Sequence, residues 1–277
     1  MTLLSRSLDG KVMVMSGGSR GIGLAIALRA ARDGAKVAII AKTEEPHPKL
    51  EGTIYTAAEE IRAAGGQALP IAGDVRDDER VEAAVRQVVE KFGGIDICVN
   101  NASAIDLSPV ASISMKRYDL MQDINTRGTF VLTKACLPYL RLAANPHVLT
   151  LSPPLNLNPA WFGRSLGYSI AKYGMSLCTL GFAEEFKPYG VAANSLWPRT
   201  TIATAAVRNL LGGDEAMRRS RHPRIVADAA HAIVTRPSKD CTGHFFIDDE
   251  VLAEEGITDL STYGGVESEL QTDIFLD

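Results

Sequence analysis

The stretch Met13-Val-Met-Ser-Gly-Gly-Ser-Arg-Gly-Ile-Gly23 decides the fold that this chain is expected to adopt. The apolar run 11–15 is typical of a buried strand, and the alanine-rich run 24–32 favours a helix. A strand, a glycine turn and a helix N-terminus can together receive a phosphate group, because the turn carries few side chains and the helix offers unpaired N–H groups. The same glycines would also suit a tight turn without a ligand, so this pattern alone leaves both interpretations open.

Strand-like and helix-like segments alternate along the rest of the chain. Apolar runs predict further strands at 36–41, 67–72, 95–99, 147–151, 191–197 and 243–247. Helical periodicity lies at 24–32, 57–64, 77–92, 115–125, 126–143, 168–187, 203–211 and 226–234, and a long loop is expected at 44–52. We therefore expect an α/β fold with a Rossmann-type, doubly wound parallel sheet of about seven strands and helices on both faces. A single domain is expected over 1–277, with 259–277 as its C-terminal tail.

The composition argues against several classes of protein. A net charge of −4 over 277 residues gives no electrostatic reason to expect a nucleic acid or an anionic membrane surface as partner. No apolar run is long enough for a membrane span, and the four scattered cysteines favour a reduced, cytoplasmic compartment. The five histidines are dispersed, so no metal site is expected. The basic run 218–224 is interpreted as a solvated turn.

The end of the second predicted strand bears on the choice of nucleotide. In a dinucleotide-binding fold this position faces the adenosine ribose, and an acidic residue there binds the 2′-hydroxyl of NAD. Here Lys42 follows the strand, and Arg20 lies in the glycine turn. Two cations favour the additional 2′-phosphate of NADP, so NADP is the predicted cofactor. A solvated Lys42 without any ligand is the alternative.

Polar residues lie at two other places where this fold binds ligands. Asn100 and Asn101 come directly after the strand 95–99, although Asn100 could simply satisfy backbone groups at the strand end. Asn125 interrupts a helical run, where its side chain competes for backbone hydrogen bonds. Such local conflicts concentrate at functional sites, although a solvated asparagine is the commoner explanation.

Tyr168 and Lys172 stand four residues apart at the start of a predicted helix, so they share one helix face. An ammonium group beside a phenol favours the phenolate, which would lower the pKa of Tyr168 toward the range of a general acid or base. Alone, such a pair is more often a packing or surface contact. Apolar residues wrap most of the helix 168–187, so one face should meet the sheet and the other a second subunit. They are Met175, Leu177, Leu180, Phe182 and Phe186.

In this order and at these separations, the motifs resemble those of the short-chain dehydrogenase/reductase family over nearly the whole chain. The matching motifs are Gly17-x-x-x-Gly21-x-Gly23, Asp74-Val75, Asn100-Asn101-Ala102, Asn125 and Tyr168-x-x-x-Lys172. The resemblance implies that Tyr168, Lys172 and Asn125 are catalytic. With the two cations above, the expected cofactor-binding residues are Gly17, Gly18, Ser19, Arg20, Gly21, Ile22, Gly23, Lys42, Asp74, Val75, Asn101 and Lys172.

The sequence departs from the pattern of this family at two positions. The catalytic serine of the family lies about thirteen residues before the tyrosine, and Leu155 occupies that position here. Ser152 is the nearest candidate if the following prolines loop out, whereas an alignment on the strand places Pro153 at the serine position. After the sixth strand the chain reads Pro198-Arg199, where the family usually has Pro-Gly.

The resemblance implies an oxidoreductase that transfers a hydride between nicotinamide and a carbonyl or alcohol carbon, with Tyr168 as proton donor or acceptor. With the two cations at the ribose, we expect it to depend on NADP(H). The loop 152–163 is apolar and adjoins the expected site, which favours an apolar substrate of acyl, terpenoid or steroid-like type. Alternatively, the same apolar residues pack against the C-terminal tail or a neighbouring subunit. Similar proteins pair the helix that corresponds to 168–187 across a two-fold axis, so a homodimer or homotetramer is expected. The competing interpretation is a nucleotide-binding protein of low turnover that acts as a redox-responsive or scaffold partner.

Overall fold

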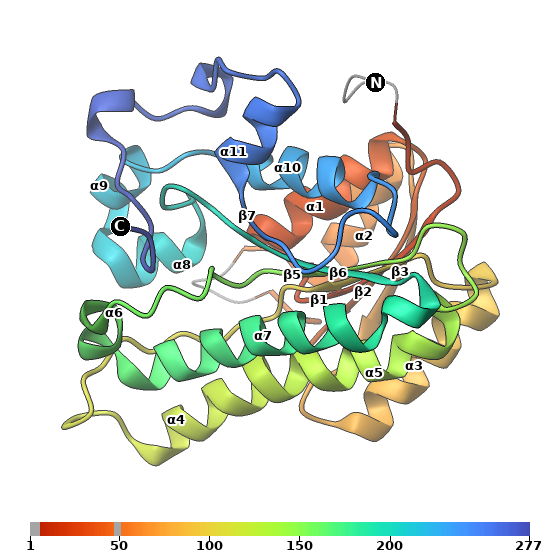
Figure 1. Cartoon of the computed structure of the whole chain (residues 1–277), viewed down its shortest axis with the longest axis horizontal. Helices are drawn as coiled ribbons and strands as arrows, with labels where there is room; N and C mark the ends of the chain where they lie inside the picture. The colour runs from red at the N-terminus through yellow and green to blue at the C-terminus, as the bar shows by residue number, and fades with distance from the viewer. Residues whose placement is uncertain (1–5, 47–50) are drawn as a thin grey trace.

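The predicted strands form one parallel sheet of seven strands in the computed structural model, which describes residues 6–46 and 51–277. The strands are β1 (Val12–Ser16), β2 (Lys36–Ala41), β3 (Gln67–Ala72), β4 (Ile97–Asn100), β5 (His147–Thr150), β6 (Ala192–Trp197) and β7 (Phe245–Ile247). Their order is β3-β2-β1-β4-β5-β6-β7, so the chain reverses direction across the sheet between β1 and β4 (Figure 1). The doubly wound α/β fold expected from the sequence is confirmed, and ligands bind such sheets at this reversal.

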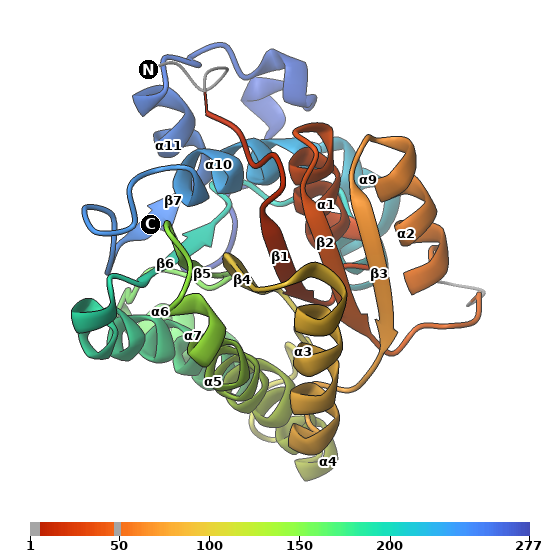
Figure 2. The same cartoon turned by 90° about the vertical axis from the view of Figure 1, so that its right-hand side faces the viewer.

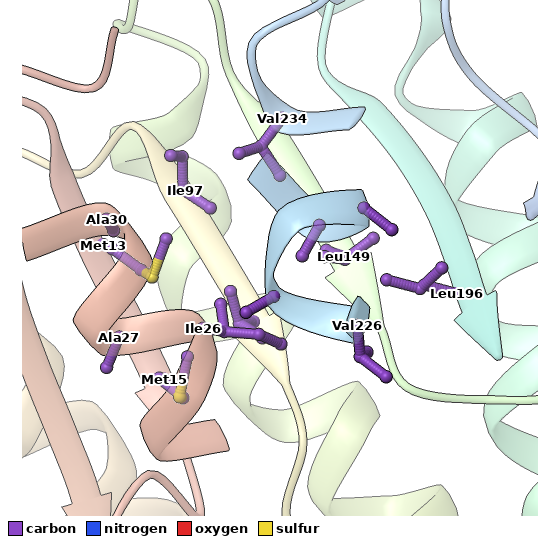
Figure 3. Packing of buried hydrophobic residues seen from close by; sticks show 14 of the residues in the cluster. Met13, Met15, Ile26, Ala27, Ala30, Ile97, Leu149, Leu196, Val226 and Val234 are labelled. Carbon is purple, nitrogen blue, oxygen red and sulfur yellow. The ribbon is translucent and has the colours of Figure 1, made fainter. Parts of the chain in front are cut away.

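Helices cover both faces of the sheet (Figure 2). One face packs against α1 (Gly21–Arg32), α2 (Ile54–Ala63), α10 (Arg224–Val234) and α11 (Asp248–Glu254), and the other against α3 (Asp78–Phe92), α5 (Gly128–Leu140) and α7 (Leu166–Glu185). The strands read as nearly continuous apolar runs because both of their faces are buried. In the first of these layers, Met13 and Met15 of β1 lie beside Ala27 and Ala30 of α1 (Figure 3).

The main differences from the predicted elements concern short or irregular helices. The runs predicted at 115–125 and 126–143 form α4 (Met115–Met121), a π-helical stretch (Gln122–Arg127) and α5. The helix predicted at 203–211 is divided into α8 (Ala205–Val207) and a π-helical stretch (Arg208–Gly212), and α9 (Gly213–Arg218) follows beyond the predicted end. The short helices α6 (Pro159–Arg164) and α11 were not predicted, because one or two turns contain too few residues to show a period. The loop predicted at 44–52 falls partly outside the described residues.

The interpretation of the basic run 218–224 as a solvated turn is wrong for Arg221. Its side chain is buried, and its guanidinium group donates to the carbonyl oxygens of Leu260 at 2.7 Å and Gly264 at 3.2 Å. It also pairs with Glu267 at 2.6 Å. The buried cation therefore organises the segment that the sequence analysis describes as a tail, in agreement with the rule that buried charges are paired.

Candidate active site

The glycine turn between β1 and α1 is packed too closely to admit side chains. An added Cβ atom at Gly17 would lie 2.9 Å from the Cα atom of Ala102, and Gly17 has a φ of +73°. At Gly23 an added Cβ atom would lie 2.5 Å from Nδ2 of Asn101 and 2.7 Å from the carbonyl oxygen of Gly17. These contacts explain the spacing of the glycines, since both positions require a residue without a side chain.

The helix that follows this turn begins without a side-chain cap. Arg20 is the N-cap residue of α1, and its side chain makes no capping hydrogen bond to the helix. Gly18 packs against Met15 and Ile39, and Ile22 is partly buried in the core cluster of this face. Open N–H groups beside a turn with few side chains fit the pyrophosphate of a dinucleotide. The predicted residues Gly17–Gly23 lie together in this turn and the first residues of α1.

The two predicted cations at the ribose side of the site already have partners. Arg20 donates to the carbonyl oxygens of Glu51 at 2.9 Å and Gly52 at 2.7 Å. The ammonium group of Lys42 lies 3.2 Å from Oδ2 of Asp74, and its side chain is 57% exposed. The hydrogen-bonded Arg76 guanidinium, together with Lys42, holds the pKa of Asp74 well below its usual range. Because Asp74 is charged, it offsets part of the positive potential that Lys42 contributes.

Asn101 connects the end of β4 to the glycine turn. Its Nδ2 atom donates to the carbonyl oxygens of Ser16 at 3.1 Å and Gly17 at 2.7 Å. The backbone N–H groups of Asn101 and Ala102 both donate to the Ser16 hydroxyl, each at 3.2 Å. Asn101 thus braces the turn. Asn100 is also buried, and its Nδ2 atom donates to the hydroxyl of Thr133 at 2.9 Å.

Asn125 lies in the π-helical stretch between α4 and α5 and is fully buried. Its Oδ1 atom accepts from the backbone N–H of Ala104 at 2.7 Å, and its Nδ2 atom donates to the carbonyl oxygen of Ala104 at 3.1 Å. The side chain therefore fixes the loop after β4 and is not solvated. Single π-turns within α-helices are frequent at functional sites. Val75 packs nearby, since an added Cβ atom at Gly128 would lie 2.8 Å from its Cγ2 atom.

Tyr168 and Lys172 are both buried on α7, with exposed fractions of 4% and 3%. The ammonium group of Lys172 donates to the carbonyl oxygen of Leu151, directly after β5, at 2.6 Å. It also lies 5.0 Å from the centre of the Trp197 ring. The pair is therefore at the carboxyl end of the central strands, where the fold binds ligands.

The expected lowering of the pKa of Tyr168 is wrong for the structure described. Burial raises this pKa, the charge of Asp273 raises it further, and a hydrogen bond from Ser103 acts in the opposite direction. Burial lowers the pKa of Lys172 to about 7, while Asp273 counteracts that effect. Burial also raises the pKa of Asp273 to about 6. The sequence pattern indicates only that the ammonium group of Lys172 would stabilise the phenolate of Tyr168. In the structure, desolvation by burial has the largest effect on the pKa of both groups.

Ser103 and Asp273 are two site residues that sequence reasoning missed. Ser103 directly follows the Asn100-Asn101-Ala102 motif, so its place at a strand end was the available signal. Asp273 lies in the C-terminal tail, and no local pattern distinguishes it. Ser152 is fully buried, and its hydroxyl has no hydrogen-bond partner among the described residues. Ser103 is therefore the serine whose hydrogen bond affects Tyr168.

Two of the apolar residues that the sequence places around the site, Trp161 and Trp197, pack against the C-terminal tail. Trp161 and Trp197 have their ring centres 6.1 Å and 6.0 Å from that of Phe275. Phe162 packs against Tyr173 with the two rings tilted and their centres 5.1 Å apart, and Leu155 is partly buried in the same cluster. Leu157 is 75% exposed and does not belong to this cluster of apolar residues. The alternative of packing against the tail thus describes Trp161 and Trp197.

The sequence of residues 11–212 matches the model of the family described as short chain dehydrogenase. The chain belongs to the short-chain dehydrogenase family. The resemblance predicted from the motifs is thereby confirmed, and family membership supports an oxidoreductase that uses a nicotinamide cofactor.

Curated relatives in this short-chain dehydrogenase family have high sequence identity. Hydroxysteroid dehydrogenase-like protein 2 from Xenopus laevis is 56% identical and that from Homo sapiens 54% identical, each over 271 residues. Each alignment covers 98% of this chain and 64% of the relative. The chain therefore spans less than two thirds of the length of these relatives.

Solved structures show the same fold. A short chain dehydrogenase from Mycobacterium thermoresistibile is 59% identical with a TM-score of 0.93, covering 98% of this chain and 96% of that chain. A protein from Xanthomonas campestris is 57% identical with a TM-score of 0.94, covering 98% and 99%. Carveol dehydrogenase from Mycobacterium avium, in complex with NAD, shares the fold at 23% identity and a TM-score of 0.75, covering 88% and 97%.

In the part of the chain that the structure describes, no helix combines the length and the apolar character that crossing a membrane requires. Residues 6–46 and 51–277 also contain no group of three or more His, Cys, Asp or Glu placed to hold a metal ion.

Proposed function

We propose that this chain transfers a hydride between a nicotinamide cofactor and a carbonyl or alcohol carbon of an apolar substrate. The observation that carries the proposal is the buried Tyr168–Lys172 pair, fixed beside Leu151 at the carboxyl end of β5. The bound nicotinamide would supply or accept the hydride. The protein supplies the proton and holds the reacting groups in place.

Each of the three catalytic residues has a role that follows from its contacts. Tyr168 moves the proton to or from the substrate oxygen at its phenol group, which is a common task of a general acid or base. Lys172 brings a titratable ammonium group to the buried site and orients it through Leu151. Asn125 holds the loop after β4 through both backbone polar groups of Ala104. Ser103 provides a second hydroxyl group beside the phenol of Tyr168, to which it is hydrogen-bonded.

Tyr168→Phe tests this proposal directly. The substitution removes one hydroxyl group and keeps the ring, so cofactor binding should stay within about threefold, while turnover should fall by about 100-fold or more. Turnover is measured as NADPH oxidation over a panel of aldehydes, ketones and 3-ketoacyl thioesters. Tyr173→Phe is the matched control, because Tyr173 lies on the same helix and donates its hydroxyl to the carbonyl oxygen of Asn156. Near wild-type turnover in Tyr168→Phe would make Tyr168 a packing residue.

NADP is the proposed cofactor, because Arg20 and Lys42 contribute positive charge at the ribose side of the turn. Wild type should bind NADPH more tightly than NADH, and Lys42→Asp should remove that preference. One charge-assisted contact corresponds to about 1.5–3 kcal/mol, which is roughly a 10- to 150-fold change in affinity. Both cofactors are titrated into both proteins by calorimetry. Equal affinities in wild type would contradict the choice of NADP.

The proposed substrate is an apolar acyl, terpenoid or steroid-like compound. Support comes from the aromatic rings of Trp161, Trp197 and Phe162 in the cluster that contains Tyr168.

A cytoplasmic location is proposed from the cysteines, which are all free. A homodimer or homotetramer is proposed from α7, where Leu177 and Leu180 are 58% and 46% exposed.

One observation favours a second function. Pro153 occupies the position of the family serine in an alignment on β5, and the phenol of Tyr168 is buried. A nucleotide-binding protein of low turnover, acting as a redox-responsive or scaffold partner, would have these features. Tight NADPH binding together with no oxidation of NADPH on the whole substrate panel would support this second function.

A further inference from the structure

The C-terminal segment Gln271–Asp277 is fastened across the residues that follow β6. The backbone N–H of Thr201 donates to the carbonyl oxygen of Gln271 at 2.9 Å, and the N–H of Asp273 donates to the carbonyl oxygen of Arg199 at 3.0 Å. The indole Nε1 of Trp197 donates to the carbonyl oxygen of Ile274 at 3.0 Å. Figures 1 and 2 both place the C-terminus at the end of the molecule that holds α6.

Phe275 is completely buried, and its ring is surrounded by aromatic side chains of the candidate site. The ring of Tyr168 stacks on it, with centres 6.2 Å apart and an interplanar angle of 27°. The ring of Tyr173 meets it edge-on at 5.3 Å, while Trp161 and Trp197 lie at 6.1 Å and 6.0 Å. Phe275 thus covers one face of the proposed catalytic tyrosine.

The backbone at Phe275 requires strong support. Phe275 has a φ of +72°, and no other residue besides glycine has a positive φ in the part of the chain that the structure describes. An aromatic residue rarely adopts this left-handed conformation. Its carbonyl oxygen accepts from Nδ2 of Asn156 at 3.2 Å, and the carboxylate of Asp277 accepts from Asn156 and Trp161 at 2.8 Å and 3.1 Å. These contacts hold the ring in place against the backbone preference.

We propose that Phe275 determines specificity, because its ring stacks on Tyr168 and occupies the place that a larger apolar group of the substrate would take. This inference rests on the proposed function, since it takes Tyr168 as the residue that meets the substrate. The two indoles and Tyr173 form an apolar aromatic enclosure around the ring. Removal of the Phe275 ring would leave an apolar, aromatic-lined space beside the ring of Tyr168, and a longer apolar substrate would fill that space.

The test compares wild type, Phe275→Ala and Leu276→Ala. Leu276 is the matched control because it is buried in the same cluster, one residue further along the segment. NADPH oxidation is measured with straight-chain aldehydes from four to twelve carbons. We expect Phe275→Ala to raise the ratio of kcat/KM for decanal to that for butanal by about tenfold, since each buried CH₂ adds several-fold in affinity. Leu276→Ala should change this ratio by less than about threefold.

A binding experiment keeps the proposal testable without turnover. Both tryptophans of the chain contact Phe275, so their fluorescence reports on its surroundings. 1-Decanol, which cannot be oxidised because no cofactor is added, should change this emission in Phe275→Ala at concentrations at least about tenfold lower than in wild type. If Phe275→Ala does not fold, Phe275→Leu serves in both assays, with a smaller effect in the same direction.

Three results would overturn the inference. These are an unchanged or lower decanal-to-butanal ratio in Phe275→Ala, equal shifts in Phe275→Ala and Leu276→Ala, and equal 1-decanol binding by wild type and Phe275→Ala. Failure of the proposed function is distinct, because it appears as full turnover in Tyr168→Phe or as no NADPH oxidation by wild type. In the latter case, the 1-decanol experiment alone decides the role of Phe275.

Discussion

Gly23→Ala should damage the cofactor turn through a collision that the structure locates. The added Cβ atom would lie 2.5 Å from Nδ2 of Asn101 and 2.7 Å from the carbonyl oxygen of Gly17, which is closer than real Cβ contacts allow. Asn101 must therefore move. Its displacement breaks the hydrogen bonds to Ser16 and Gly17 that brace the turn.

The size of the effect follows from these contacts. Two hydrogen bonds contribute about 0.5–1.5 kcal/mol each, and overpacking adds about 1–3 kcal/mol. The total is about 2–6 kcal/mol, and it appears as lower stability, weaker cofactor binding or both. If it appeared only in binding, the affinity for NADPH would fall by about 30-fold or more.

Calorimetric titration with NADPH and thermal unfolding measure the two contributions. Gly94→Ala is the matched control, because nothing lies within 4 Å of a Cβ atom added there and no positive φ is involved. The double variant Gly23→Ala/Asn101→Ala should lose less than the sum of the single variants, since removal of Asn101 relieves part of the collision. If Gly23→Ala matches Gly94→Ala in both Tm and affinity, the turn is not packed as described and the reasoning is refuted.

Two further predictions concern assembly and pH. Leu177→Glu on the exposed face of α7 should convert the oligomer into a monomer in sedimentation at micromolar concentration, whereas Val266→Glu, at a similarly exposed residue, should not. A monomeric wild type would show that this face makes no subunit contact. Burial raises the pKa of Asp248 from 3.8 to about 7, so this carboxyl reduces stability as the pH rises between these values, by about 4 kcal/mol in all. Asp248→Asn should therefore lose less stability than wild type between pH 4 and pH 8 in denaturant unfolding. An equal loss of stability in the two proteins would contradict the raised pKa of Asp248.

The sequence predicted the fold from local patterns that the structure confirms. The run through Met13–Gly23 specifies a strand, a turn and a helix, because the glycine positions and the apolar periodicity act over a few neighbouring residues. The alternation of such units restricts the topology to a doubly wound sheet. The family resemblance implied a functional role for Asn125, and its conflict with a helical run corresponds in the structure to a π-helical stretch. Whether Asn125, Tyr168 and Lys172 act in catalysis stays a prediction.

Tertiary structure alone decided the contacts that join distant parts of the chain. Asp273 lies about a hundred residues after Lys172 in sequence, yet its charge affects the pKa of Lys172. Phe275 reaches the face of Tyr168 only because the tail is fastened beside β6 and Arg221 is buried under its first part. Sequence periodicity contains no information about such partners, since a side chain is buried by whatever packs on it and not by its neighbours in the chain. Desolvation, which sets the pKa of Tyr168 and of Lys172, depends on this packing for the same reason.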